Sequence, residues 1–135
     1  MMYISGIHAL NIPCLLETCG DWHTSALQWN DIQMVDSGKS MFGVYGIEKN
    51  KMVFPLGEKY NVANHIRALL DLLLAGRFSV AQGMRDDFIC NPKYDEEIFS
   101  KVIMMKGLPH WAQIDGFMKR EYKLKWLEFK ERRSN

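Results

Sequence analysis

The sequence predicts an α+β fold in which short N-terminal strands and a hairpin are followed by a four-helix C-terminal part. The composition, 47% hydrophobic and 24% charged over 135 residues, is that of one globular domain. Glycines and polar turns are frequent in the first half, and apolar residues recur at helical spacing in the second. We therefore expect a single domain over residues 1–135, with a mixed β and turn portion at 1–59 and a helical portion at 60–135.

The first portion is expected to hold strands. Alternation of apolar and polar residues predicts a strand within residues 1–12. Thr24 is placed to cap a short helix that runs to Trp29. In "MFGVYGIEKNKMVF" two apolar arms, one on each side, flank a polar turn at residues 48–51, which is typical of a β-hairpin.

Four helices are predicted after the hairpin from their caps and apolar spacing. Asn61 is placed to cap the first helix, and Gly76 stands where a left-handed residue ends it. The second helix begins at Ser79, and the third begins at Asp95, with acidic residues in its first turn. The fourth is expected to run without a break over residues 110–132.

The fourth helix carries an unusually wide apolar surface. Large side chains trace one stripe, and three further apolar residues lie off it. One interpretation is that the helix spans its own domain; the other is that one side docks on another protein. On the second interpretation the partner-binding anchors are Trp111, Met118, Tyr122, Trp126 and Phe129, with Arg67 and Arg85 as secondary candidates.

The stretch "HALNIPCLLETCGDWH" collects most of the reactive side chains of the first portion. Thiolates and imidazoles are zinc ligands, so Cys14, Cys19 and His23 are the candidate metal site. The alternative is that both cysteines behave as small hydrophobic residues in a partly buried segment.

The same stretch offers a catalytic hypothesis. Asp21 and His23 lie two residues apart, so an extended chain points both side chains to one face, where a carboxylate orients an imidazole. With His8 they define a small hydrolase or nuclease, in which Cys14, Cys19 or Ser25 is the nucleophile. Ordinary turn and capping chemistry at Asp21 is the competing explanation.

The charge of the chain is nearly balanced, with a net value of +1, but the C-terminal tail is basic. Residues 119–135 hold seven Lys or Arg against three Glu, a net charge of +4. Interleaved cations and aromatic rings can bind RNA, here through Lys119, Arg120, Lys123 and Lys125. The same composition suits contact with an acidic protein, which the low overall charge favours. Membrane binding is not expected, because the three glutamates oppose anionic lipid.

Cellular location and cofactors are predicted from what the sequence contains. The longest apolar run, residues 68–75, is too short to cross a bilayer, and residues 1–30 do not read as a signal peptide. Three cysteines, an odd number, do not predict a disulfide framework. We therefore expect free thiols, a cytoplasmic location and no cofactor.

Four segments resemble a family of small bacterial proteins that accompany abortive-infection-type nucleotidyltransferases in toxin–antitoxin-like gene pairs. They are "YISGIHALNIPC", "GDWHTSALQW", "NVANHIRALLDLL" and "AQGMRDDFICN". None of them is a catalytic signature, so the resemblance assigns no catalytic residue. It implies a non-enzymatic, antitoxin-like protein that holds a toxin-like enzyme inactive by covering its active site or substrate groove.

Overall fold

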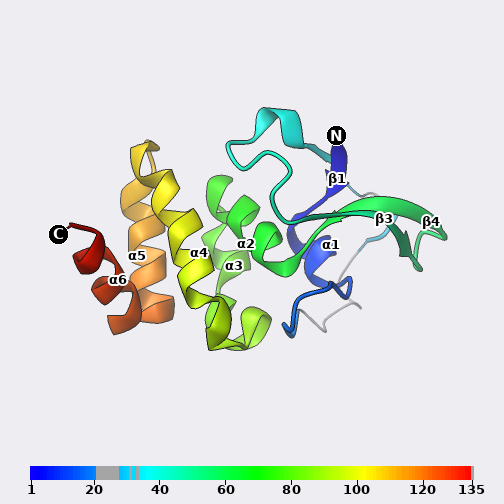
Figure 1. Ribbon diagram of the computed structural model, residues 1–135. Helices are drawn as coiled ribbons and strands as arrows, with labels where there is room; N and C mark the ends of the chain where they lie inside the picture. Colours follow the sequence, from blue (N-terminus) through cyan, green and yellow to red (C-terminus); the bar gives the residue numbers. More distant parts are fainter. Residues whose placement is uncertain (21–27, 31, 33, 135) are drawn as a thin grey trace.

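The computed structural model describes residues 1–20, 28–30, 32 and 34–134. It confirms the α+β fold class: a small sheet occupies one end of the molecule, and helices extend from it to the other end (Figure 1). The N-terminus lies in the sheet, and the C-terminal helix lies at the far end. α2 lies between these two ends and packs against elements of both.

Among the described residues, four strands form one sheet in the order β2-β1-β4-β3. They are β1 (Met2–Ile4), β2 (Met34–Asp36), β3 (Ile47–Val53) and β4 (Glu58–Ala63). β1 runs antiparallel to β2 and parallel to β4, and β3 pairs antiparallel with β4. The β3–β4 hairpin projects from the body of the molecule (Figure 1).

The first elements differ from the prediction. The strand expected within residues 1–12 ends at Ile4, and the short helix α1 (Gly6–Leu10) follows. Gly6 has φ +63°, a conformation that glycine adopts without steric cost, and it turns the chain into α1. The helix expected from Thr24 falls mainly outside the described residues, and Trp29 itself lies in a turn.

The predicted hairpin exists, but its turn was placed wrongly. β3 runs through residues 48–51, and the chain reverses between Phe54 and Gly57 instead. Pro55 and the positive φ of Gly57 suit a tight turn. The polar residues at 48–51 are accommodated by a register shift between β3 and β4 and by Asn50 at φ 53°.

α2 (His65–Leu74) is the central helix, and it begins later than predicted. β4 extends to Ala63, so the cap is Asn64 rather than Asn61: its side-chain oxygen accepts the Arg67 N–H at 2.9 Å. The helix ends just before Gly76, at φ +72°, as predicted. Eight of its ten residues are buried, because it is covered on most sides.

The next segment is less regular than predicted. Instead of one helix from Ser79, the structure has α3 (Phe78–Ala81) and a π-helical segment, Met84–Ile89, separated at Gly83 with φ +94°. α4 (Asp95–Val102) confirms the third predicted helix and continues as a 3-10 turn, Ile103–Gly107.

The fourth predicted helix is broken in two. α5 (Trp111–Tyr122) and α6 (Leu124–Ser134) are separated by Lys123, which has φ 57° and ψ −128°. This conformation ends α5 and turns α6 back beside it (Figure 1). A single straight helix would have left part of its wide apolar arc uncovered, whereas two packed helices cover each other's apolar sides.

The fold-back buries most of the proposed anchors. Phe99 of α4 lies among the rings of Tyr122, Trp126 and Phe129, at centroid distances of 4.9–5.4 Å. Those three residues and Met118 are at most 4% exposed. The expectation that these four side chains form a free docking surface is therefore wrong, and the helical stripe is part of the protein's own core.

Candidate functional site

The loop of residues 11–20, which follows α1, lies against the start of α2 and against the π-helical segment. The His65 ring nitrogen Nε2 lies 2.9 Å from the Ile12 carbonyl oxygen. The N–H groups of Cys19 and Gly20 both donate to the Phe88 carbonyl, at 3.0 and 2.8 Å. These bonds hold a loop without regular secondary structure in one place, and with it two of the three cysteines.

A thiol, a hydroxyl and an imidazole meet inside this loop. Cys14 Sγ lies 3.5 Å from Thr18 Oγ1, which lies 2.7 Å from His65 Nδ1. His65 is buried and Cys14 is partly buried. We call Cys14, Thr18 and His65 the thiol cluster. A nucleophile beside a base that a third group orients is the geometry of covalent catalysis and of reactive thiols.

The electrostatics of the thiol cluster favour an ion pair. Burial opposes ionisation of Cys14, but hydrogen bonds from His65 and Thr18 outweigh it and lower the pKa of the thiol to about 7. Burial likewise opposes protonation of His65, yet the hydrogen bond and negative charge of Cys14 raise the pKa of the imidazole. Each charged partner stabilises the other.

The other two cysteines correct a prediction. Cys19 and Cys90, 71 residues apart in sequence, form a disulfide, so the expectation of three free thiols is wrong. Cys19 therefore cannot act as a zinc ligand in this state, and His23 of the predicted zinc set lies outside the described residues. Within the described part of the chain no group of three His, Cys, Asp or Glu side chains is arranged to hold a metal ion.

The predicted catalytic set is represented here by His8 alone, because Asp21 and His23 lie outside the described residues. His8 Nε2 lies 3.0 Å from the Gln28 carbonyl oxygen, and the ring meets Trp29 edge to face. His8 also lines a cavity of about 410 Å³ beside Asp71. The structure does not join His8 to the thiol cluster.

Arg67 is a structural residue. Its side chain is completely buried, with Nε 3.0 Å from Asp71 and Nη1 2.8 Å from the Gly43 carbonyl oxygen and 2.7 Å from that of Tyr45. Nη2 donates to the Tyr3 hydroxyl, which donates to Asp71. A guanidinium with these partners fixes the chain inside the fold, so its assignment as a partner contact is wrong.

Arg85 and Trp111 are the two proposed partner residues that remain partly accessible. The Arg85 side chain is 38% exposed and lies 3.6 Å from Asp86. Trp111 is half-buried, with its ring 6.2 Å from that of Trp126. Their assignment as partner contacts stays a prediction.

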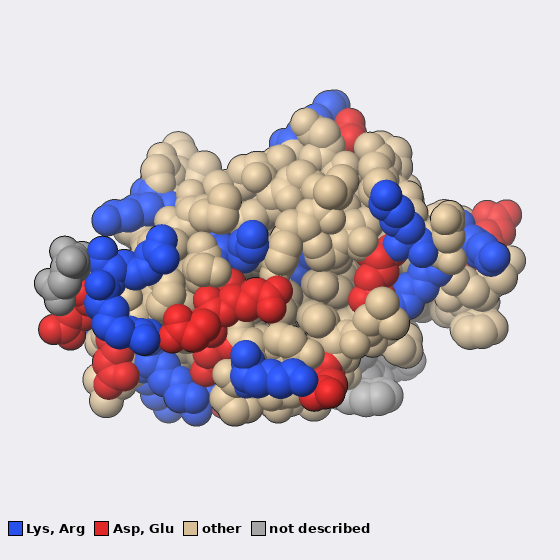
Figure 2. Space-filling model, in the orientation of Figure 1, with Lys and Arg blue, Asp and Glu red and all other residues tan. Residues whose placement is uncertain are grey.

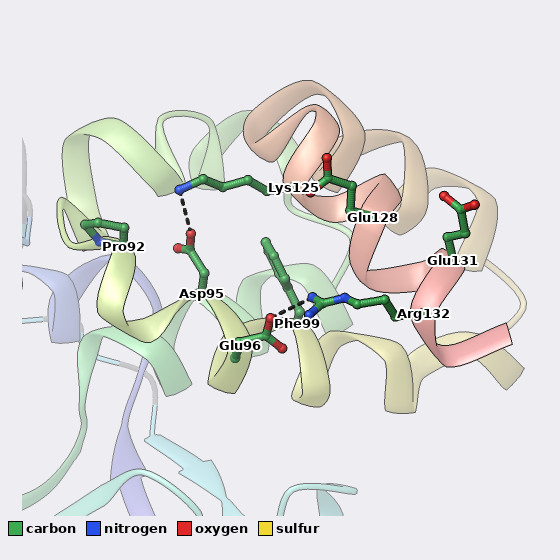
Figure 3. Close-up of a pocket in the computed structure, with 8 residues that line it drawn as sticks. All are labelled: Pro92, Asp95, Glu96, Phe99, Lys125, Glu128, Glu131 and Arg132. Carbon is green, nitrogen blue, oxygen red and sulfur yellow. Dashed lines mark hydrogen bonds and ion pairs between the residues drawn. The ribbon is translucent and has the colours of Figure 1, made fainter. Parts of the chain in front are cut away.

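A groove of about 680 Å³ lies between α4 and α6, with Phe99 at its floor (Figure 3). Lys125 reaches Asp95 at 3.2 Å, and Arg132 reaches Glu96 at 2.7 Å, so two α6 cations are already bonded to α4. Figure 2 shows acidic and basic side chains interleaved over this end of the molecule.

This pairing bears on the predicted RNA interface. Of its four residues, Lys119, Arg120 and Lys123 are exposed and Lys125 is bonded to Asp95. Lys130, further along α6, is bonded to Asp115 at 2.7 Å. The basic tail is thus partly neutralised by carboxylates of the same chain, which weakens its attraction for polyanions.

Exposed apolar side chains occur on loop 11–20 and on the β3–β4 hairpin. Leu15 is 87% exposed, and Phe54, at the tip of the β3–β4 hairpin, is 86% exposed. The Leu15 N–H donates to Glu48 Oε2 of β3 at 2.8 Å, which joins loop 11–20 to the hairpin. We call Leu15, Met52 and Phe54 the hairpin surface.

Sequence reasoning named Cys14 but missed its partners. His65 lies in an apolar helical pattern that predicts core. The disulfide partner of Cys19 was missed as well, because Cys90 is far away in sequence. Two signals were available: Thr18 lies between two cysteines, and a Phe-Pro pair stands at the hairpin turn. Without the fold, neither shows that Thr18 contacts Cys14 or that Phe54 is exposed.

No family model, curated protein or solved structure matches this chain. In the described residues, no helix has the length and apolar character needed to cross a membrane.

Proposed function

We propose that the protein acts by binding another protein, as an antitoxin-like partner that covers the active site or substrate groove of a nucleotidyltransferase-type enzyme. The observation that carries the proposal is the hairpin surface. Leu15 and Phe54 are the two most exposed large apolar side chains among the described residues, and a hydrogen bond joins their segments. Exposed large apolar side chains form a binding surface when they are presented from neighbouring segments, and the Leu15–Glu48 hydrogen bond brings loop 11–20 to the hairpin that carries Phe54.

The hairpin is suited to steric occlusion. It projects from the sheet, so that its tip can enter a concave site while the helices stay outside (Figure 1). Met52 of β3, two residues before Phe54, is 42% exposed and adds apolar surface to the hairpin. Large aromatic side chains contribute most of the affinity in many interfaces, so Phe54 is the expected anchor. Arg85 and Trp111 are secondary candidates.

The test is co-expression of this protein with the product of the neighbouring gene, followed by size-exclusion chromatography. One shared peak is expected at micromolar protein. Phe54→Asp and Leu15→Asp are each expected to raise the dissociation constant of the complex by about tenfold or more, because a charge would enter an apolar contact.

The control is Leu124→Asp, since Leu124 is 69% exposed on α6, away from the hairpin. It is expected to leave the complex intact. Two separate peaks for the unaltered proteins would contradict the proposed function, and equal effects of all three variants would contradict the proposed surface.

The proposal places the protein in the cytoplasm, where the nucleotide substrates of such an enzyme occur. A cytoplasmic thiol pool opposes disulfides, so the Cys19–Cys90 bond tests this location. The free thiols of the protein are blocked in intact cells, and the number of blocked cysteines is counted by a gel shift. The count shows whether one cysteine or all three are free. Three reactive thiols would support the cytoplasm, and one would favour an oxidising compartment.

A further inference from the structure

Loop 11–20 presents one free thiol. All three cysteines of the sequence lie within the described residues, and two of them are bonded to each other. Cys14 is therefore the one thiol available for reaction, and it is partly exposed. It lies beside Leu15, which faces solvent.

The hydrogen bonds define a path for the proton of this thiol. A carbonyl oxygen only accepts, so the Ile12 carbonyl requires that His65 Nε2 carries a hydrogen. In the neutral imidazole, Nδ1 is then the acceptor, and it faces the Thr18 hydroxyl at 2.7 Å. That hydroxyl in turn faces Cys14 Sγ at 3.5 Å. The thiol proton can thus pass through Thr18 to His65.

The imidazole is held in this orientation by the backbone around it. Gly20 packs so closely that a Cβ atom there would lie 2.7 Å from His65 Cε1 and 2.5 Å from the Leu10 carbonyl oxygen. A ring held at Nε2 by the Ile12 carbonyl and closely approached by Gly20 at Cε1 stays aligned with Thr18. Such preorganisation distinguishes a working base from an incidental neighbour.

We propose that Cys14 is a nucleophilic thiol, activated by His65 through Thr18, that exchanges with low-molecular-weight disulfides and carries a reversible mixed disulfide. This inference is independent of the proposed partner surface, because it rests on the interior contacts of loop 11–20. A disulfide is the favoured electrophile because exchange needs only in-line approach to one accessible sulfur.

The exchange moves one proton and replaces one S–S bond by another. Cys14 gives its proton through Thr18 to His65, and the thiolate attacks one sulfur of the reagent disulfide. A Cys14–reagent disulfide forms, the reagent S–S bond breaks, and the departing thiolate recovers a proton from the imidazolium. No net oxidation occurs, because one disulfide replaces another.

The modification is expected to persist until an external thiol removes it. Cys19 and Cys90 are occupied with each other, so neither offers a free thiol to resolve the mixed disulfide. Reversal therefore needs a second, small thiol from solution.

The test uses the full chain and two probes. Oxidised glutathione is expected to add once, at Cys14, as seen by intact mass and peptide mapping. The rate of reaction with the chromogenic reagent 5,5′-dithiobis(2-nitrobenzoate) is then followed against pH, and its midpoint is expected at a thiol pKa of about 7.

Two variants test activation. In His65→Gln the midpoint should rise to about 8.5, and the rate near pH 6 should fall about fivefold once the higher nucleophilicity of the less acidic thiol is included. Thr18→Val keeps the side-chain shape and His65, and its midpoint should also rise. Should His65→Gln fail to fold, as judged by circular dichroism, Thr18→Val decides the result.

His110→Gln is the matched control, because His110 also contacts a backbone carbonyl, that of Leu73 at 3.2 Å, outside the thiol cluster. It is expected to leave the profile unchanged, and Cys14→Ser should abolish the reaction. A midpoint near 8.5 in the unaltered protein, a profile that neither cluster variant changes, or no glutathione adduct at Cys14 would each overturn the proposal.

Discussion

Gly20, at the end of loop 11–20, packs closely against His65 of α2, and it has φ +73°. An alanine there would be strained by its backbone and would collide with His65 and with the Leu10 carbonyl. We expect Gly20→Ala to lower the free energy of unfolding by roughly 2–4 kcal/mol, measured by urea denaturation.

Gly57→Ala separates the two causes of this loss. Gly57 has φ +71°, but nothing lies within 4 Å of a Cβ at that position. Gly57→Ala should therefore lower the free energy of unfolding only by the cost of a left-handed backbone at alanine, about 1 kcal/mol. Equal losses in both variants would mean that the contact between Gly20 and His65 contributes nothing.

The buried charge of Arg67 is expected to stabilise the fold. Arg67→Met removes the charge and leaves Asp71 and the carbonyls of Gly43 and Tyr45 with fewer partners inside the protein. We expect a loss of about 3–5 kcal/mol in unfolding free energy, because breaking a buried ion pair isolates the remaining charge. Arg77→Met, at an exposed position, should cost under about 0.5 kcal/mol. Similar losses in the two variants would contradict the structural role of Arg67.

Among the elements, the α5–α6 pair depends on a residue that is poorly suited to its backbone. Lys123 occupies φ 57° and ψ −128°, which glycine adopts more readily than lysine. Lys123→Gly should therefore raise the free energy of unfolding by about 1 kcal/mol. Lys119→Gly, inside α5, should lower it by about 1 kcal/mol. Thermal denaturation of both variants checks the sign, and a loss in each would contradict the break at Lys123.

The same pair of helices predicts a dependence on pH. Asp115 on α5 accepts hydrogen bonds from Trp126 Nε1 at 2.8 Å and Lys130 Nζ at 2.7 Å on α6. Burial opposes its charge, but these donors outweigh burial and lower the pKa of the Asp115 carboxyl. A carboxyl with a lowered pKa stabilises the fold above its unfolded pKa of about 3.9 and loses that effect as pH falls.

Asp115→Asn should therefore be less stable than the unaltered protein near neutral pH. The difference between the two unfolding free energies should shrink as pH falls below about 4. Urea denaturation at a series of pH values measures it. A difference that stays constant into the acid range would contradict a stabilising role for the Asp115 charge.

Elements with local signals were predictable, and those set by distant contacts were not. Gly76 and the acidic first turn of α4 marked helix ends that the structure confirms. The break at Lys123 carries neither glycine nor proline, so nothing local distinguishes it from helix interior. The thiol cluster joins Cys14 to His65 across 51 positions, a distance over which spacing carries no information.

In the whole molecule, the sheet end and the helical end are expected to unfold together. α2 is buried on most sides and contacts β4 and α1 at one end and α3 and α4 at the other. The Cys19–Cys90 disulfide adds a covalent link between loop 11–20 and the π-helical segment. A shared central helix and a cross-link predict one cooperative unit.

Amide hydrogen exchange on the oxidised and reduced protein tests this. The slowest amides of β1, α2 and α5 should exchange with one common free energy of opening. Reducing the disulfide releases a loop of 71 residues in the unfolded chain, so that common value should fall by up to about 4 kcal/mol. If α5 and α6 were instead a separate unit, reduction would lower protection in β1 and α2 while leaving it unchanged in α5. An equal fall at both ends is expected, because Phe99 of α4 packs against Trp126 and Phe129 of α6, and α4 itself packs on α2.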